Sequence, residues 1–373
     1  MTMKVRCDRG ELTESLGNVL GIVPATQATT KPIFQNFYLK TEEGHLVVEA
    51  TDLDIGARIR LERVEVEEEG ELALPAQRFY SVVRELPDKN LVIEGTQEGR
   101  GAFLRAGGYE FRMLGEDPRE FPRVPGFEVG GSVKVSGDNF AEMLRRVAVA
   151  ASRDVARFQL TGVFFEVEGD RLTLTATDGK RLTNDHMRID NPGASSRSAI
   201  VPNRVVDVLL KVLTQGQAEV SLVIGDPNFQ ASFGVGELTA KVVQGSYPEY
   251  RIALSFEPRI SVTAKKNDLL AAARSAALMT DKETATVLFR FEDEKARLET
   301  QATQIGESKI ELPIKLEGEP IEVRYNPMYL IDALRCLTDE EVRIEFIEAG
   351  KPGAVRGGQH YRHLIMPLVA GRS

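Results

Sequence analysis

Of the six Ala-Thr dipeptides in the sequence, three recur at one spacing and divide the chain into three similar segments. The copies begin at Ala50, Ala176 and Ala302, so that each begins 126 residues after the one before. Each copy ends a run in which apolar and polar residues alternate, which is the pattern of a strand. A chain with this repeat is expected to fold as three similar units.

Each segment also contains two stretches with the composition of a helix. The first stretches are residues 11–16, 139–144 and 268–273, and the second follow Pro75, Pro202 and Pro327. Proline is favoured at the first position of a helix, because the N–H group that it lacks would have no partner there. We therefore expect these prolines to begin their helices. The Ala-Thr copies, the first helical stretches and the prolines recur in the same order in each segment, which predicts a triplicated chain.

Between the helices, apolar and polar residues alternate with period two, which indicates strands with one buried face. The clearest runs are residues 37–40, 45–51, 91–94, 163–168, 220–224 and 342–346. Each segment should thus be an α+β domain, with two helices packed on antiparallel sheets and about eight short strands. Proline and glycine interrupt both patterns near residues 121–126 and 254–258, which predicts domains at 1–126, 127–256 and 257–373.

The composition is typical of a globular protein of several domains. The chain has 373 residues, of which 42% are hydrophobic and 28% are charged. It contains no apolar run long enough for a membrane helix, and its N-terminus lacks the apolar core of a secretory signal. Cys7 and Cys336 have no metal-ligand spacing. Two lone thiols fit a reducing, cytoplasmic compartment.

Charge is distributed unevenly along the sequence. The whole chain carries −9, whereas the regions around the helical stretches together carry +3; these regions are residues 10–20, 75–86, 137–153, 202–213, 265–279 and 326–337. This difference favours a basic surface formed by helices and an acidic surface formed by sheets and loops. Ordinary solvated helix faces are the alternative explanation. The cations concerned are Arg78, Arg84, Arg145, Arg146, Arg153, Arg204, Lys211, Lys265, Lys266, Arg274 and Arg335.

No catalytic motif stands out. The phosphate-binding loop, the dinucleotide-binding glycine pattern and the nucleophile elbow are all missing from the sequence. His360 and His363 are three positions apart on an expected strand, so they should face opposite sides and not share a metal. We expect no metal and no cofactor.

Asp52 and Asp178 each follow an Ala-Thr copy and permit two interpretations. Together with Asp54 or Asp185 they could form carboxylate pairs for acid–base or metal chemistry. Alternatively, they could form turns by accepting hydrogen bonds from nearby backbone N–H groups. The third segment has Gln304 at this place, so the fold does not require an acid. We favour the turn interpretation.

The middle copy continues as Asp178-Gly179-Lys180-Arg181-Leu182, and at this point the chain resembles a known family, the bacterial β sliding clamps. The matching stretches are Thr51-Asp52-Leu53-Asp54, Leu74-Pro75-Ala76, Ala176-Thr177-Asp178-Gly179, Arg181-Leu182, Val201-Pro202, Tyr247-Pro248-Glu249-Tyr250 and Met366-Pro367. They span nearly the whole chain in the order of the family.

The resemblance implies a ring-shaped, head-to-tail homodimer with six similar domains, helices that line the hole and sheets on the outside. Such a ring encircles duplex DNA without reading its sequence. It tethers the replicative polymerase, the clamp loader and repair polymerases through their short linear motifs. The resemblance also implies a cytoplasmic, nucleoid-associated protein that has no catalytic activity and does not bind membranes.

The resemblance further implies three sets of site residues. The pocket for partner motifs would be lined by Leu160, Thr177, Gly179, Lys180, Arg181, Leu182, Pro248, Ile252, Ala253, Leu364, Ile365, Met366, Pro367 and Leu368. DNA would contact Arg78, Arg145, Arg146, Arg153, Arg157, Phe158, Gln159, Arg204, Lys211, Lys265, Lys266 and Arg274. The dimer interface would include Phe111 and Met113 on an edge strand of one chain, facing Leu278 and Met279 at a helix end of the other.

The chain departs from the family pattern in several places. Lys180 stands where histidine is usual, and Ile252 replaces an arginine on the pocket wall. Residues 369–373 extend the chain beyond its usual end, and Ala28 replaces a loop arginine. The first three departures would change which partner motifs are preferred.

Two other functions remain as alternatives. One is a metal-dependent hydrolase that uses Asp52 or Asp178. The other is a triplicated scaffold that binds proteins without encircling DNA.

Overall fold

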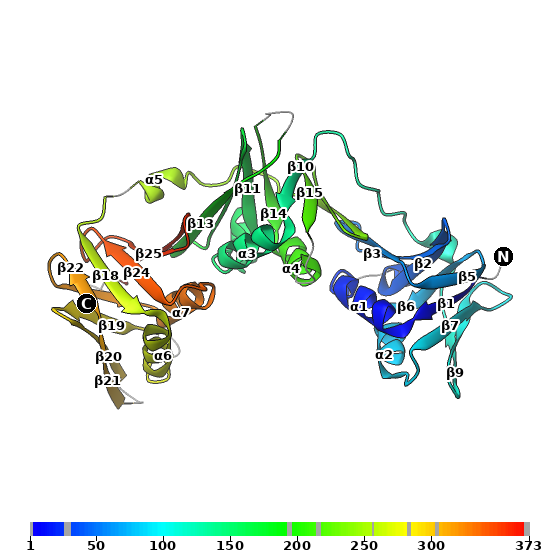
Figure 1. Cartoon of the computed structure of the whole chain (residues 1–373), viewed down its shortest axis with the longest axis horizontal. Coiled ribbons are helices and arrows are strands. Elements are labelled where there is room, and N and C mark those ends of the chain that lie inside the picture. The colour runs from blue at the N-terminus through cyan, green and yellow to red at the C-terminus, as the bar shows by residue number, and fades with distance from the viewer. Residues whose placement is uncertain are drawn as a thin grey trace. The chain divides into compact units, whose positions relative to one another are not determined.

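The computed structural model describes residues 3–25, 31–191, 196–213, 218–255, 257–281, 285–302 and 306–368. The chain divides into two compact units, shown together in Figure 1. Unit 1 comprises Met1–Ala141 and Ile189–Val242, and unit 2 comprises Glu142–Arg188 and Val243–Ser373. Ala28, Gln304 and the C-terminal extension, about which the sequence led to expectations, lie outside the described residues.

Unit 1 contains the first third of the chain and part of the middle third. Its strands are β1 (Lys4–Asp8), β2 (Asn36–Glu42), β3 (His45–Thr51), β4 (Ile55–Leu61), β5 (Val64–Glu68), β6 (Glu71–Pro75), β7 (Asn90–Gly95), β8 (Gly101–Ala106), β9 (Tyr109–Leu114), β10 (Val133–Ser136), β14 (Arg197–Pro202), β15 (Glu219–Ile224), β16 (Asn228–Phe233) and β17 (Gly236–Lys241). Its helices are α1 (Arg9–Val19), α2 (Ala76–Glu85) and α4 (Asn203–Val212), with short 3-10 turns η1 (Pro32–Gln35) and η2 (Pro118–Glu120).

Two antiparallel sheets form the frame of unit 1. One has the strand order β5-β1-β7-β8-β9, and the other has the order β10-β15-β16-β17-β4-β3-β2-β6. The pairing of β17 with β4 joins strands of the first and middle thirds of the chain into one sheet. Helices α1 and α2 pack against each other, and α4 contacts α1.

Unit 2 contains the rest of the middle third and the last third. Its strands are β11 (Gly162–Glu168), β12 (Arg171–Thr177), β13 (Arg181–Arg188), β18 (Ile260–Lys265), β19 (Val287–Glu292), β20 (Lys295–Ala302), β21 (Gly306–Pro313), β22 (Lys315–Glu317), β23 (Ile321–Tyr325), β24 (Glu341–Phe346), β25 (Gly353–Gly357) and β26 (Tyr361–Ile365). Its helices are most of α3 (Gly137–Ala148), then α5 (Arg251–Leu254), α6 (Lys266–Ala277), α7 (Pro327–Arg335) and the 3-10 segment η3 (Val155–Leu160).

The sheets of unit 2 repeat the plan of unit 1. One runs in the order β11-β12-β13-β26-β25-β24-β18-β22, and a smaller one in the order β21-β20-β19-β23. The pairing of β13 with β26 joins the middle and last thirds of the chain, as β17 and β4 join the first and middle thirds. Sheet continuity across the repeats therefore explains why three sequence segments form two compact units.

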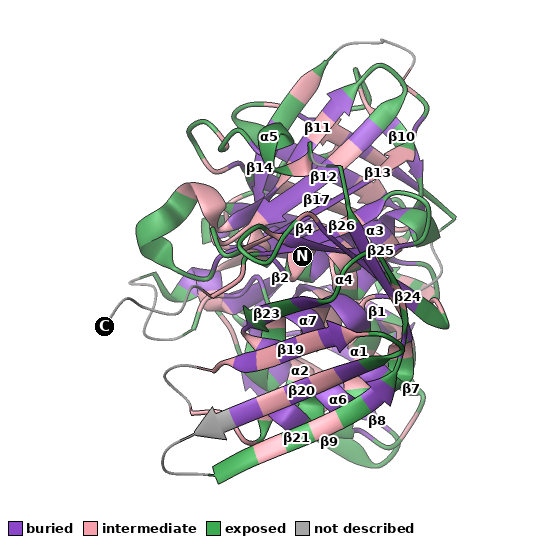
Figure 2. Ribbon diagram, turned by 90° about the vertical axis from the view of Figure 1, so that its left-hand side faces the viewer, coloured by how far each residue is buried: buried purple, intermediate pink, exposed green. Residues whose placement is uncertain are grey.

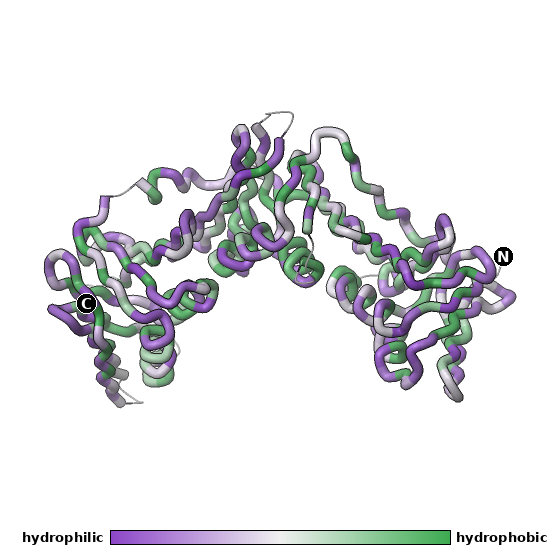
Figure 3. The backbone as a smooth tube through the Cα atoms, in the orientation of Figure 1, coloured by the Kyte–Doolittle hydropathy of each residue, from purple (hydrophilic) through white to green (hydrophobic). Residues whose placement is uncertain are grey.

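The predicted elements are present throughout the described ranges. The six alternating runs fall within β2, β3, β7, β11, β15 and β24, and the six helical stretches correspond to α1, α2, α3, α4, α6 and α7. Buried and exposed residues alternate along strands such as β23, so one face of each packs on a core (Figure 2). Figure 3 shows the same closely spaced change between hydrophobic and hydrophilic residues.

The prediction that a proline begins each second helix is wrong for two of the three. Pro327 is the first residue of α7, and the side chain of Asn326 caps that helix by accepting from the N–H of Met328 at 2.9 Å. Pro75 and Pro202 instead end strands β6 and β14 and occupy the cap position before α2 and α4. Their φ angles of −55° and −56° are compatible with a strand end and with a helix start, because the ring fixes φ and leaves ψ free.

Among the described residues, no helix combines the length and apolar character needed to cross a membrane.

Candidate partner-binding site and nucleic-acid surface

The turn after β12 is held together by the side chains of Thr177 and Asp178. The Asp178 carboxylate accepts from the N–H groups of Lys180 (2.9 Å) and Arg181 (3.0 Å). The Thr177 hydroxyl accepts from the N–H of Gly179 at 3.0 Å and donates to the carbonyl of Arg181 at 2.6 Å. Gly179 has φ +84°, and a Cβ atom there would lie 2.8 Å from a guanidinium nitrogen of Arg157. Glycine adopts this left-handed backbone conformation without strain, whereas Leu53 has a φ of +77° at the same place in the first repeat.

The first repeat builds the same turn after β3. The Asp52 carboxylate accepts from the N–H groups of Asp54 (3.0 Å) and Ile55 (2.8 Å). The Thr51 hydroxyl accepts from the N–H of Leu53 and donates to the carbonyl of Ile55. The interpretation of Asp52 and Asp178 as turn formers is confirmed by these bonds. Within the described ranges, no three His, Cys, Asp or Glu side chains are grouped so that they could hold a metal ion.

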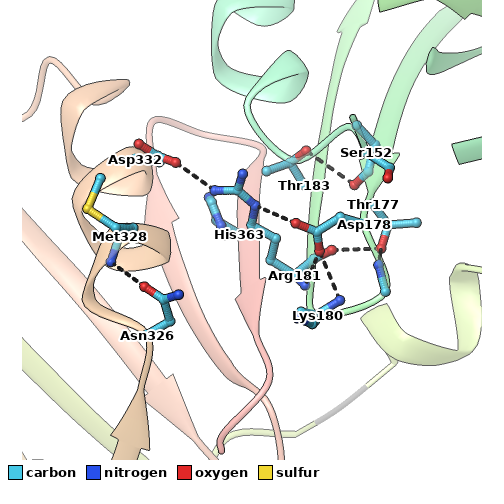
Figure 4. A network of polar contacts seen from close by, with 12 residues as sticks. Ser152, Thr177, Asp178, Lys180, Arg181, Thr183, Asn326, Met328, Asp332 and His363 are labelled. Carbon is cyan, nitrogen blue, oxygen red and sulfur yellow. Dashed lines mark hydrogen bonds and ion pairs between the residues drawn. The ribbon is translucent and has the colours of Figure 1, made fainter. Parts of the chain in front are cut away.

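Arg181 connects this turn to helix α7, as Figure 4 shows. Its guanidinium lies 3.0 Å from the Asp178 carboxylate and 2.7 Å from that of Asp332. It also lies 4.7 Å from the centre of the Tyr329 ring, within the range of a cation–π contact. The Arg181 side chain is only 12% exposed. It therefore acts as a link between β13 and α7.

The alternation along β13 separates the predicted pocket residues into two sets. Thr183, two positions after Arg181, donates to the carbonyl of Val147 in α3, so both side chains lie on the helix side of the sheet. Ile365, the register partner of Arg181, is buried in the core of the last third of the chain. Arg181 and Ile365 thus face away from the side that carries Leu182.

The other face of the same strands forms an apolar cluster, which we call the apolar row. Leu182 of β13 pairs in register with Leu364 of β26, and Leu364 pairs with Ala354 of β25. Tyr250 packs on these three side chains, and Phe164, Tyr247 and Leu254 surround them. The N–H of Met366 donates to the carbonyl of Lys180 at 2.9 Å, which extends the pairing of the two strands.

The segment from Tyr247 to Leu254 borders this apolar row. The Tyr247 ring stacks on Phe164 with centroids 4.8 Å apart, and the Tyr250 hydroxyl donates to Glu166 at 2.7 Å. Both aromatic anchors hold α5 in place. Ile252 on α5 is 76% exposed, although it is a large apolar residue. Ile252 thus adds exposed apolar surface beside the buried row.

The remaining predicted lining residues are placed as follows. Thr177, Leu160, Pro367 and Leu368 are partly buried, whereas Gly179, Lys180, Pro248, Ala253 and Met366 are exposed.

Sequence reasoning missed two residues that shape the site, Tyr329 and Tyr250. Tyr329 supports the Arg181 guanidinium, and Tyr250 covers Leu182. The Tyr247-Pro248-Glu249-Tyr250 stretch was singled out in the sequence, but only Pro248 was assigned to the pocket. No local pattern connected Tyr329 with Arg181, because the two residues are far apart in sequence.

His360 and His363 have different surroundings, but the prediction that both lie on one strand is wrong, because β26 begins at Tyr361 and His360 lies in the turn before it. His363 is fully buried, and its Nδ1 atom lies 2.9 Å from the Tyr361 hydroxyl. Burial, with a smaller effect of the nearby Arg181 charge, lowers the pKa of His363 to about 3. His360 instead stacks on His186, with ring centroids 4.1 Å apart.

The buried neutral His363 should make unit 2 less stable in acid. An unfolded chain binds a proton at this histidine below pH 6.5, whereas the folded chain does so only near pH 3, so stability is complete above pH 6.5 and falls as the pH drops. Between pH 7 and pH 5 the loss should be about 2 kcal/mol. Urea unfolding followed by hydrogen exchange in β26 measures it. His363→Gln, which cannot titrate, should lose much of this pH dependence, and an unchanged dependence would contradict the assignment.

The predicted DNA-contact residues fall into two groups. Those with exposed side chains are Arg78, Arg145, Arg153, Arg157, Phe158, Arg204, Lys211, Lys265 and Arg274, whereas Arg146, Gln159 and Lys266 are partly buried.

Several of these cations already have partners within their own unit. Arg146 pairs with Glu142 and Asp185, Arg204 pairs with Asp52 at 2.6 Å, and Lys266 donates to the carbonyl of Leu337. Arg157 donates to the carbonyl of Asp178 at 3.3 Å, so it lies against the turn of the candidate pocket.

The predicted interface residues lie at sheet edges and at a helix end. Strand β9 is the edge strand of its sheet, and Phe111 on it is 40% exposed, whereas Met113 is buried in unit 1. Leu278 caps the C-terminus of α6 and is 80% exposed. Met279 lines a hollow of about 800 Å³ beside edge strand β21.

Comparison with known proteins matches three family models in succession. They are the N-terminal (residues 3–125), central (134–249) and C-terminal (254–369) domains of the DNA polymerase III beta subunit. The beta sliding clamp of Chlamydia muridarum is 25% identical over 366 residues, covering 98% of this chain and 99% of its own, and that of Escherichia coli K12 is 26% identical over 368 residues, covering 98% and 100%. The crystal structure of the Bacillus subtilis DNA polymerase sliding clamp superposes with a TM-score of 0.91 at 25% identity and full coverage of both chains. These matches establish the three-domain α+β clamp fold, and the chain belongs to the DNA polymerase III beta subunit family.

Proposed function

We propose that two copies of this chain close head to tail into a ring around duplex DNA and tether the replicative polymerase to it. The observation that carries this proposal is the succession of three family models, each over a segment that supplies one pair of helices. Family membership makes the chain a non-catalytic processivity clamp and not a hydrolase. The bonds of Asp52 and Asp178, which are used to form turns, agree with this.

The helices supply the surface that would face DNA. Arg78 of α2, Arg145 of α3, Lys265 at the start of α6 and Arg274 of α6 are exposed, although the whole chain carries −9. Contacts from such cations to phosphates bind DNA without reading its sequence, and they weaken steeply with salt. A ring that slides needs contacts of this kind. Arg146, which is occupied by two carboxylates, would contribute less than the sequence suggested.

Ring closure would join β9 of one chain to the α6 end and strand β21 of the other. Tyr109, Phe111 and Leu114 on β9 are exposed apolar side chains at a sheet edge. Leu278 and the hollow beside Met279 offer a complementary apolar surface. Because the two patches differ, the contact would be heterologous, and two such contacts would close the ring if the rotation between the two chains is 180°. The domain boundaries at 1–126, 127–256 and 257–373 belong to the same proposal.

Partners would dock at the apolar row and α5 through short linear motifs. The polymerase, the clamp loader and repair polymerases would share this surface in the cytoplasm, at the nucleoid. Ile252, which is 76% exposed, and Leu182, which is 8% exposed at the end of the row, would provide apolar contacts, and Lys180 would provide a cation at the edge. Helical or extended peptides bind such clefts through a few apolar anchors.

Leu182→Ala should weaken the binding of a partner motif peptide about tenfold, because truncating a central apolar anchor typically costs 1–3 kcal/mol. Isothermal titration with the clamp-binding peptide of the replicative polymerase from the same organism measures it. Leu174→Ala on β12 is the matched control, since Leu174 is buried but lies on the other face of the sheet. Equal affinity of the Leu182→Ala variant and the native chain would contradict the assigned pocket.

A further inference from the structure

Three arginines stand side by side on neighbouring strands of unit 2. Arg362 of β26 pairs in register with Arg356 of β25, and Arg356 pairs with Arg343 of β24. We call these three residues the arginine row. Like charges directly opposite each other on adjacent strands repel, so such a row needs negative charge close by.

The protein supplies less negative charge than the row requires. Glu345 is 2.7 Å from Arg356 and 3.5 Å from Arg343. Arg362 donates to the carbonyl of Leu254 at 3.2 Å, and the ion pairs among the described residues give it no carboxylate. Burial and the adjacent Arg356 lower the pKa of Arg362. Among the ion pairs of the described residues, Glu345 is thus shared by Arg343 and Arg356, whereas the hydrogen bond of Arg362 goes to a backbone carbonyl.

The other acids near the row are already engaged. Glu166 and Glu168 lie 2.8 Å and 2.9 Å from Arg251, and Glu168 is also 3.5 Å from Arg171. The nearby rings of His186 and His360, stacked on each other, add no negative charge. A further anion would thus be favourable at this place.

The row borders an open hollow that adjoins the apolar row. The hollow has a volume of about 500 Å³ and lies between α5 and the strands that carry the arginines. Arg362 is two positions from Leu364 on β26, and Arg356 is two positions from Ala354 on β25. Two residues along a strand span about 7 Å, so the two rows are immediate neighbours. If one residue of a bound peptide lies at the apolar row, the side chain two residues further along the peptide can reach the arginines.

Unit 1 contains a surface that corresponds to the one carrying the arginine row in unit 2. Counted from Thr51 and Thr177, Arg58 of β4 corresponds to Asn184 of β13, and its register partner Glu237 corresponds to Arg362. The chain's own segment after Val124 lies on this surface, with the N–H of Phe127 donating to Glu237 at 3.3 Å.

The N–H of Glu128 also donates to Gln230 of the neighbouring strand, at 2.9 Å. In unit 1 a segment of the chain therefore covers this surface. In unit 2 the segment from Tyr250 to Leu254 also lies on the corresponding surface, but the charge at the Glu237 position is reversed and a hollow of about 500 Å³ is present.

We propose that the arginine row binds an acidic side chain of the partner segment whose apolar residues occupy the apolar row. This proposal rests on the proposed docking function and adds a preference for motifs flanked by aspartate or glutamate.

The test compares synthetic peptides that share one apolar clamp-binding motif and carry two Asp or two Asn residues on its N-terminal or its C-terminal side. Fluorescence polarisation with the full-length protein should show one Asp peptide binding about fivefold tighter than its Asn counterpart, as expected for a partly exposed ion pair. Arg362→Gln and Arg343→Gln should reduce this advantage below about twofold, and the Asn peptide should bind as before. Arg290→Gln is the control, since Arg290 pairs with Glu299 and Glu322 on the smaller sheet.

Equal binding of Asp and Asn peptides to the native chain would overturn the proposal, as would an advantage that survives in Arg362→Gln. The docking function is tested separately by the Asn peptides. If Leu182→Ala weakens their binding while no Asp advantage exists, only the arginine row proposal fails. If Leu182→Ala leaves their binding unchanged, the docking function itself fails.

Discussion

Leu278→Asp should disrupt the proposed dimer and leave single chains. Leu278 is 80% exposed at the end of α6, so the substitution costs the isolated chain little. In the proposed ring the same side chain would be covered by β9 of the partner subunit, and an unpaired buried charge typically costs 3–5 kcal/mol. That cost corresponds to a dissociation constant of the dimer that is about 150- to 4000-fold higher.

Sedimentation over a range of protein concentrations measures the change. Val129→Asp is the matched control, because Val129 is equally apolar, is 78% exposed and lies in a connecting segment of unit 1. The control should dimerise like the native chain. A Leu278→Asp variant that dimerises with native affinity would contradict the placement of the interface at the end of α6.

Arg181→Met should destabilise unit 2 by about 2–3 kcal/mol and weaken motif binding as well. The substitution leaves Asp178 and Asp332, which are 19% and 27% exposed, without their shared counter-charge. Removing one member of a buried ion pair costs 3–5 kcal/mol, and the partial exposure of these carboxylates reduces that figure. The turn at Gly179 would also lose its link to α7.

Urea unfolding and peptide titration measure the two effects. Adding Asp332→Asn to Arg181→Met should restore part of the stability, because it removes one unpaired charge. Arg297→Met is the control, since Arg297 pairs with Glu311 and Glu292 on a more exposed strand face and should cost no more than about 1 kcal/mol. An Arg181→Met variant as stable as this control would show that the link to α7 is unimportant.

The regular features of the fold could be predicted because they depend on local patterns. The alternating run at residues 45–51 has the same first and last residues as β3. The turn-forming roles of Asp52 and Asp178 follow from their position after a strand. The division into two units could not be predicted in this way. It depends on the pairing of β4 with β17 and of β13 with β26, whose members are far apart in sequence.

The pocket was predicted as one set of residues, and the structure divides it between two faces of a sheet. Leu182 faces α5, whereas Arg181 faces α7, as the period of a strand requires. The resemblance assigned Thr177 and residues 179–182 to one pocket, without regard to the alternation of side chains along β13. The arginine row was hidden for another reason, since Arg343, Arg356 and Arg362 become neighbours only through the register of β24, β25 and β26.

The most direct test of encirclement is the release of the loaded protein when its DNA is cut. The protein is loaded on a nicked circular plasmid with the clamp loader of the same organism, and free protein is removed by gel filtration. We expect the protein to stay on the circular plasmid at moderate salt. It should leave soon after a restriction enzyme linearises the plasmid, because a ring with weak phosphate contacts slides off a DNA end. Equal retention on circular and linearised DNA would contradict encirclement.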